Sequence, residues 1–293
     1  MPELPDLVFI QKRLAPKLIG RIVEAATVSE PVVLRILEQG DFKDLLAGQR
    51  ILDFGRHGPF LRLELERHDL VMHLMLAGRL RLGPRGEKRL AHTVFTLELD
   101  AEGRLSYGDE KNMGRVYLCP KGRFESIPGY LTQGIDISTA EFSWKLFSSL
   151  ISGKRNQARV FIMDQSILSA IGNAYADEIL FEAGIHPKTA CNKLSEAERR
   201  TLFEAIGSVI AWGTEEVERA DRPTEEKVRG HMRVRNRGGE ACPRCGGTIR
   251  KAGVLGFDSF FCPQCQSDRT GRGLDWNKLP VVPKVDPPRE ERS

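Results

Sequence analysis

Four of the six cysteines in the 293-residue chain form two pairs near its C-terminal end. Cys242 pairs with Cys245 and Cys262 with Cys265, each in a Cys-x-x-Cys knuckle, and sixteen residues separate the two knuckles. This spacing is typical of a zinc ribbon, in which a hairpin brings the second knuckle back to the first. Four thiolates leave a tetrahedral zinc ion no open position, so we expect one structural Zn²⁺.

Two disulfide bonds are the alternative for these knuckles. The sequence shows no signal peptide and no long apolar run, so we expect a reducing cytoplasm, which favours metal over disulfides, and no membrane partner. The other cysteines, Cys119 and Cys191, have no partner at ligand spacing. We expect them to be buried or inert.

Two patterns of apolar residues divide the rest of the chain. From about Ile22 to Leu118, short apolar runs alternate with turn signals, which predicts a β-sandwich. From about Phe142 to Val217 the period is helical, with Gly172 among the breaks. A leading helix is predicted by an apolar stripe made of Leu7, Ile10, Leu14 and Leu18. The predicted fold class is therefore α+β.

The first six residues can place a secondary amine beside a carboxyl group. Pro2 is small enough for Met1 to be trimmed, which would leave a free pyrrolidine nitrogen at the chain terminus. Amino termini titrate near pH ~8, so part of this amine is neutral at pH 7 and can attack a sugar or aldehyde carbon. Glu3 would be the adjacent acid or base. The alternative is a proline that merely begins a helix.

A basic, glycine-punctuated run lies just before the cysteine knuckles. The net charge of the whole chain is only +4, so total charge alone does not indicate a nucleic-acid partner. The run suits phosphate contact through its four arginines, and a solvated linker is the alternative. These arginines are Arg229, Arg233, Arg235 and Arg237.

With these motifs together, the chain resembles the formamidopyrimidine-DNA glycosylase and endonuclease VIII family of base-excision repair enzymes. The similar segments are the Pro-Glu-Leu-Pro start, residues 171–178, the Ile-His-Pro turn at 185–187 and the cysteine ribbon. The resemblance implies a DNA glycosylase with AP lyase activity that binds damaged double-stranded DNA. It also implies a monomer in the bacterial cytoplasm, associated with the nucleoid.

The resemblance also implies a domain order. We expect an N-terminal catalytic β-sandwich over residues 1–135 and a helix-two-turn-helix DNA-binding domain over 136–230. A zinc-ribbon finger would follow over 231–268, and we expect the charged, proline-rich tail at 269–293 to be disordered.

By this resemblance Pro2 is the nucleophile on the sugar C1′ of a flipped, damaged nucleotide, and Glu3 assists ring opening. Asp6 stands where the family has Glu. Arg159 and Asn173 match positions that hold phosphates, and Lys111 stands where a family Arg faces the orphaned base. A helix cap is the alternative role for Asn173, and a solvated charge is the alternative for Arg159 and Lys111.

Three departures from the family pattern concern the DNA contacts. Pro59 replaces a catalytic Lys, and His57 or Arg56 could substitute only with a different backbone path. In the ribbon hairpin, Phe257 replaces an Arg that grips a phosphate, so one charge-assisted contact is missing. The wedge that fills the vacated base stack is Leu76 with Met113 rather than Met with Phe. Core packing is the alternative role for these two residues.

The sequence leaves three functions open. The first is an active glycosylase and AP lyase, the second an AP-site or damaged-DNA binding protein with weak or no glycosylase activity, and the third a zinc-ribbon nucleic-acid binder. The first, with an altered damage preference, is favoured, and the third has little weight because Pro2 and Glu3 are both retained. Residues 212–224 are acidic and poor in glycine, unlike a loop that closes over 8-oxoguanine. An oxidised pyrimidine or an AP site is thus as consistent with the sequence as an oxidised purine.

Overall fold

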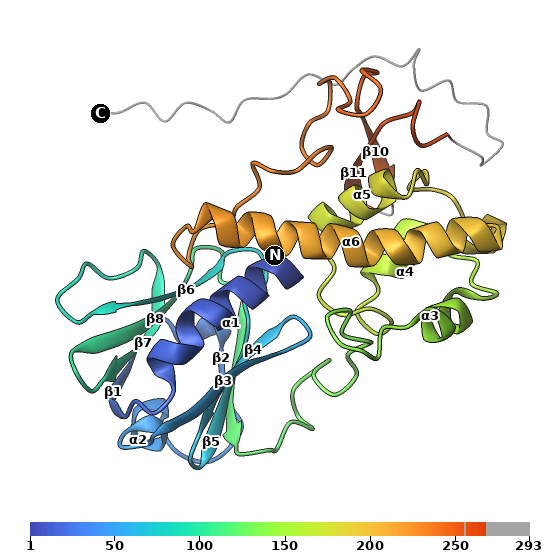
Figure 1. Cartoon of the computed structure of the whole chain (residues 1–293). Helices are drawn as coiled ribbons and strands as arrows, with labels where there is room; N and C mark the ends of the chain where they lie inside the picture. Colours follow the sequence, from blue (N-terminus) through green and yellow to red (C-terminus); the bar gives the residue numbers. More distant parts are fainter. Residues whose placement is uncertain (255, 268–293) are drawn as a thin grey trace, which may run out of the picture. The chain divides into compact units, whose positions relative to one another are not determined.

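The computed structural model describes residues 1–254 and 256–267 (Figure 1), which fall into two compact units. The first unit comprises residues 1–136, 168–172 and 210–229, and the second comprises 137–167, 173–209 and the residues from 230 onward. Residues 168–172 and 210–229, which lie in the range predicted for the helix-two-turn-helix domain, belong to the first unit. The predicted disordered tail lies outside the described residues.

A β-sandwich preceded by helix α1 (Leu4–Leu18) forms the first unit. The four-stranded sheet has the order β1 (Val23–Val28), β7 (Thr93–Leu99), β8 (Gly103–Asp109) and β6 (Gly78–Pro84). The five-stranded sheet has the order β2 (Leu34–Ile36), β9 (Arg115–Pro120), β5 (His68–His73), β4 (Phe60–Leu65) and β3 (Ile51–His57). Neighbouring strands are antiparallel except β2 and β9, and two short helices, η1 (Pro31–Val33) and α2 (Phe42–Leu46), connect strands.

The core of this unit follows from its apolar pattern. All four residues of the predicted α1 stripe are at most 3% exposed, and α1 packs against β3. In β4, apolar residues alternate with half-buried polar ones, as expected for a strand that buries one face. The predicted leading helix and β-sandwich are both confirmed.

Helices and a small hairpin form the second unit. The helices are α3 (Trp144–Ile151), α4 (Ala158–Met163), α5 (Asn173–Glu182), η2 (Cys191–Lys193) and the N-terminal part of α6 (Glu196–Ala220), whose C-terminal part belongs to the first unit. A capping box begins α6, because Ser195 N donates to Glu198 Oε2 at 2.8 Å and Glu198 N donates to Ser195 Oγ at 3.3 Å. The hairpin pairs β10 (Arg250–Val254) with β11 (Phe257–Phe261).

Among residues 1–254 and 256–267, no helix has both the length and the apolarity that crossing a membrane requires.

Candidate active site and zinc centre

The start of α1 is fixed to residues 170–172 by two hydrogen bonds. Leu4 N donates to the carbonyl oxygen of Ala170 at 2.8 Å, and Gly172 N donates to Glu3 Oε2 at 2.9 Å. Ala170 adopts the left-handed conformation with φ +63°, which L-residues rarely adopt. Glu3 is 4% exposed. Its carboxylate is therefore held at one place at the N-terminus of the helix.

Gly172 is required by the close approach of Glu3. A Cβ atom added at Gly172 would lie 2.7 Å from Glu3 Cδ and 2.9 Å from Glu3 Cγ, closer than nonbonded carbons come. Any side chain at this position would therefore displace the carboxylate. The sequence marked Gly172 only as a helix break, and its role in seating Glu3 was not predicted.

Asp6 holds the first turn of α1 from both sides. Its Oδ2 accepts a hydrogen bond from Glu3 N at 2.8 Å, one half of a capping box. Arg229 forms a bidentate ion pair with it, with Nη1 2.8 Å from Oδ1 and Nη2 2.6 Å from Oδ2. Asp6 is 5% exposed. Arg229, predicted as part of a phosphate-binding run, thus faces this carboxylate.

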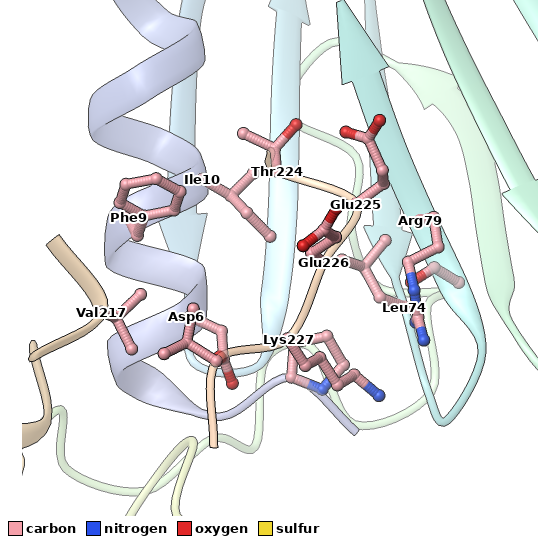
Figure 2. Close-up of a pocket in the computed structure, with 13 residues that line it drawn as sticks. Asp6, Phe9, Ile10, Leu74, Arg79, Val217, Thr224, Glu225, Glu226 and Lys227 are labelled. Carbon is pink, nitrogen blue, oxygen red and sulfur yellow. The ribbon is translucent and has the colours of Figure 1, made fainter. Parts of the chain in front are cut away.

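A pocket beside the chain terminus is lined by Pro2 and Asp6 of the N-terminal segment, by Leu74 and Arg79, and by residues 224–228, which we call the strap (Figure 2). The strap follows α6 and is attached to the edge of the four-stranded sheet. Thr224 Oγ1 donates to the carbonyl oxygen of Leu80 at 2.7 Å, and Lys227 Nζ donates to that of Leu76 at 2.6 Å.

The terminal amine has an unusual electrostatic environment. Burial, followed by the positive charge of Lys227, lowers the pKa of the Met1 amine from its usual 8.0 to about 5. Burial likewise lowers the pKa of Lys227. The Met1 amine is therefore largely neutral at pH 7.

Three residues predicted to contact DNA lie in two turns at one end of the sandwich. Leu76 follows β5, and Lys111 and Met113 follow β8. Strand register brings these turns together, because Gly78 pairs with Asp109 across β6 and β8. Leu76 is 47% exposed and Met113 42% exposed, so neither is a core residue, and Lys111 is exposed as well.

The turn at Pro59 offers no replacement for the lysine of the family pattern. Pro59 is buried between β3 and β4. Arg56 forms an ion pair with Asp136 and donates to the carbonyl oxygen of Gly58 at 3.1 Å. The ring nitrogen Nε2 of His57 lies 2.8 Å from the carbonyl oxygen of Tyr130. Both candidate substitutes are thus bound to other parts of the first unit.

In the second unit, Arg159 and Asn173 form a pair. Arg159 Nη2 donates to Asn173 Oδ1 at 2.6 Å, and Arg159 Nε lies 3.2 Å from Asp177 Oδ1. The Arg159 side chain is 1% exposed and Asp177 is fully buried. Arg159 is therefore no solvated surface charge. Asp177 was missed as a functional candidate, although it lies within the motif at residues 171–178.

Four sulfur atoms converge at the ribbon. The Sγ atoms of Cys242, Cys245, Cys262 and Cys265 all lie within 4.8 Å of one another. The Cys245–Cys262 separation is 3.5 Å and the Cys242–Cys265 separation is 3.9 Å. Four sulfurs about 2.3 Å from a tetrahedral zinc ion are about 3.8 Å apart, whereas a disulfide requires about 2.05 Å. The cluster therefore fits Zn²⁺, and the disulfide alternative fails.

The other two cysteines are buried, as predicted. Cys119 and Cys191 are both 0% exposed. Burial raises the pKa of the Cys119 thiol to about 12 and that of Cys191 to about 11. Both therefore stay protonated at neutral pH, the form that is neither a good nucleophile nor a metal ligand.

Buried acidic residues of α5 hold the ribbon in the second unit. Glu178 accepts hydrogen bonds from the backbone N–H groups of Arg233, Val234 and Arg235, at 2.9–3.1 Å. The Arg235 side chain donates to Asp177 Oδ2 at 2.8 Å. Arg233 and Arg235 of the basic run thus contact α5.

Known proteins match this architecture over most of the chain. Residues 1–116 match the formamidopyrimidine-DNA glycosylase N-terminal domain, 134–221 its H2TH domain, and 239–267 the zinc finger found in FPG and IleRS. The formamidopyrimidine-DNA glycosylase of Heliobacterium modesticaldum is 32% identical over 276 residues, covering 91% of this chain and all of the relative. The chain belongs to the formamidopyrimidine-DNA glycosylase family.

Other members of the family agree with this assignment. The enzyme of Halalkalibacterium halodurans is also 32% identical, over 91% of this chain and 100% of its own length. The structure of Lactococcus lactis Fpg in complex with DNA containing an abasic site is 27% identical, with a TM-score of 0.81 over 91% of this chain and 100% of that chain. The predicted family, fold class and structural zinc ion are confirmed.

Proposed function

We propose that this DNA glycosylase and AP lyase of base-excision repair uses the Pro2 amine as its nucleophile and Glu3 as its acid or base. The observation that carries the proposal is the buried Glu3 carboxylate, held by Gly172 N–H beside Pro2, at a chain terminus where burial lowers the pKa of the Met1 amine. Attack at an anomeric carbon requires a neutral amine as nucleophile and a fixed carboxyl group as acid or base.

The reaction proceeds through an iminium ion. The Pro2 nitrogen attacks the sugar C1′, the bond from C1′ to the damaged base breaks, and Glu3 exchanges the proton that opens the sugar ring. Loss of a proton from C2′ then expels the 3′ phosphate, which cuts the strand by β-elimination. Hydrolysis of the remaining iminium releases the Pro2 amine.

Five other residues would bind the DNA. Leu76 and Met113 are exposed at the end of the sandwich and would fill the space left by the flipped nucleotide, with Lys111 facing the orphaned base. Arg159 and Asn173, paired in the second unit, would hold phosphates near the lesion. The proposal includes a monomer acting on double-stranded DNA, in the bacterial cytoplasm at the nucleoid.

Borohydride trapping tests the nucleophile. Reduction of the iminium joins the mature protein covalently to DNA that carries an AP site, and a protein shown by mass spectrometry to retain Met1 serves as the matched control. We expect the control to lose trapping and Pro2→Gly to reduce it, because glycine leaves a primary amine. Full trapping and nicking by the protein that retains Met1 would exclude Pro2.

Glu3→Gln tests the acid or base separately. Glutamine keeps the shape and the acceptor for Gly172 N–H but does not exchange the proton, so base release from an intact lesion should fall at least tenfold more than nicking at a preformed AP site. If both fall equally, Glu3 acts in the shared iminium step instead. A wild-type protein that traps AP sites but releases no base from any lesion would favour the AP-site binding alternative.

A further inference from the structure

Lys227 is a half-buried lysine at the terminal amine that no motif of the sequence indicated. It lines the same pocket as Pro2, and Figure 2 shows it with Asp6 and Arg79 at one end of that pocket. Its Nζ donates to the carbonyl oxygen of Leu76 at 2.6 Å, and its positive charge lowers the pKa of the Met1 amine. The strap therefore brings a second amine to the chain terminus.

The attachment of the strap fixes this position on both sides. Thr224, three residues before Lys227, is bound to the backbone of Leu80, and Arg229, two residues after it, forms the bidentate ion pair with Asp6. A lysine side chain has four flexible carbon–carbon bonds, so an anchored backbone limits where its ammonium group can go.

Several other charged groups face the amine. Glu3 and Asp6 contribute negative charge from the start of α1, Arg229 and Arg79 contribute positive charge, and Glu225 and Glu226 of the strap line the same pocket. Burial lowers the pKa of His73 on β5 to about 4, so this ring is neutral at pH 7. Both carboxylate oxygens of Asp6 are bound by Arg229 in the bidentate ion pair. Among these cations, Lys227 lowers the pKa of the Met1 amine the most.

We propose that Lys227, carried by the strap, is a positioning residue for the Pro2 amine. An ammonium group can donate a hydrogen bond only to an amine that is itself neutral, so Lys227 favours the neutral form of Pro2. It also ties that form to the Leu76 turn. This inference rests on the proposed function, since it concerns the same nucleophile.

The pH dependence of the amine tests the proposal without DNA. Acetylation of the mature N-terminus by acetic anhydride, followed by mass spectrometry from pH 4 to 9, gives the titration of the Pro2 amine. The neutral variants are Lys227→Met and Lys227→Gln, the second of which keeps a donor for Leu76. Lys227→Arg keeps the charge. Lys12→Met is the matched control, because Lys12 is an exposed lysine of the same unit that pairs with Glu218.

The sign of the shift follows from the charge. A nearby cation disfavours the protonated amine, so removing it raises the pKa of the amine, by about one unit for charges within hydrogen-bonding distance. The pH at which the N-terminal amine is half-reactive toward acetic anhydride should rise by about one unit in both neutral variants. It should stay unchanged in Lys227→Arg and Lys12→Met. The rate of borohydride trapping near the midpoint should fall several-fold in the same two variants.

The outcomes separate this inference from the proposed function. If the half-reactive pH of both neutral variants coincides with that of the wild type, or if Lys227→Arg shifts it equally, Lys227 does not act on the amine. If peptide mapping finds the trapped DNA on Lys227 itself, Lys227 is a nucleophile and the positioning role is wrong. If labelling shifts as expected but no variant or wild-type protein traps DNA, the inference holds and the proposed nucleophilic role of Pro2 fails.

Discussion

Replacing Gly172 with alanine should impair base release while leaving the amine in place. The added Cβ would lie 2.7 Å from Glu3 Cδ, 2.9 Å from Cγ and 2.9 Å from Oε1. Carbon atoms in contact are about 3.5–4.0 Å apart, so relief of the clash requires a shift of about 1 Å. Glu3 is 4% exposed and its N–H is bound to Asp6. The carboxylate is therefore displaced while the helix start stays fixed.

The size of the effect follows from this shift. Overpacking at a buried site costs about 1–3 kcal/mol of the free energy of unfolding, which leaves most of the protein folded at 25 °C. A misplacement of about 1 Å in a catalytic group costs about 100-fold in rate. Base release from a lesion-bearing duplex should fall by about this factor. The yield of borohydride trapping at a preformed AP site should fall far less, since Pro2 is not displaced.

The matched control is Gly207→Ala, which makes the same substitution within α6. No heavy atom lies within 4 Å of the Cβ position at Gly207. Alanine is favoured over glycine by about 0.5–1 kcal/mol in a helix, so this variant should be slightly more stable and fully active. Single-turnover base release, trapping and urea denaturation would be measured on both variants. If Gly172→Ala releases base as fast as Gly207→Ala does, the position of Glu3 does not control the reaction.

Two further predictions concern the ribbon. Cys262→Ser should release the zinc ion and weaken DNA binding about tenfold or more. Unfolding of the hairpin withdraws hydrogen bonds from Asp177, which holds Arg159, and the proposed charge-assisted phosphate contact of Arg159 contributes ~1.5–3 kcal/mol. Zinc content, DNA affinity and circular dichroism are compared with those of Cys191→Ala, and unchanged affinity in a zinc-free protein would contradict this prediction. Phe257→Arg, at a residue 53% exposed, should steepen the slope of log affinity against log salt by about 0.9, or about 3.5-fold between 50 and 200 mM salt. Leu131→Arg adds the same charge at a residue 62% exposed in the first unit, and an equal slope in both variants would mean that the hairpin does not face DNA.

Local sequence patterns predicted most of the elements. Strand β4 lies in the region from about Ile22 to Leu118 that predicts short strands, and the hairpin predicted between the two knuckles is formed by β10 and β11. These elements could be predicted because the alternation of apolar and polar residues and the spacing of the cysteine knuckles reflect local geometry. The division into two units could not be predicted from the sequence. Residues 168–172 join the first unit through hydrogen bonds to Glu3 and Leu4, which lie far away in the sequence.

The candidate site shows the same limit. Pro2, Glu3 and the four zinc ligands are named by motifs, whereas no motif names Lys227, and Arg229 was predicted to contact phosphate rather than Asp6. The ion pair between Arg229 and Asp6 joins residues 223 positions apart, and no periodicity carries that information. A half-buried lysine in a polar loop has no signature in a single sequence, because its role depends on which terminus folds against it.

Asp177 explains why the zinc centre can influence the proposed phosphate contacts without touching DNA. This buried carboxylate accepts hydrogen bonds from Ser259 Oγ at 2.8 Å and Phe260 N at 3.1 Å, both on strand β11, and it pairs with Arg159 at 3.2 Å. Breaking one partner of a buried ion pair leaves an uncompensated charge. A hairpin that unfolds on zinc loss would withdraw two of the hydrogen bonds that fix Asp177, and Arg159 would lose its fixed orientation toward Asn173. The structural zinc ion thus stabilises the Arg159–Asn173 pair through α5, and this connection is contained within the second unit.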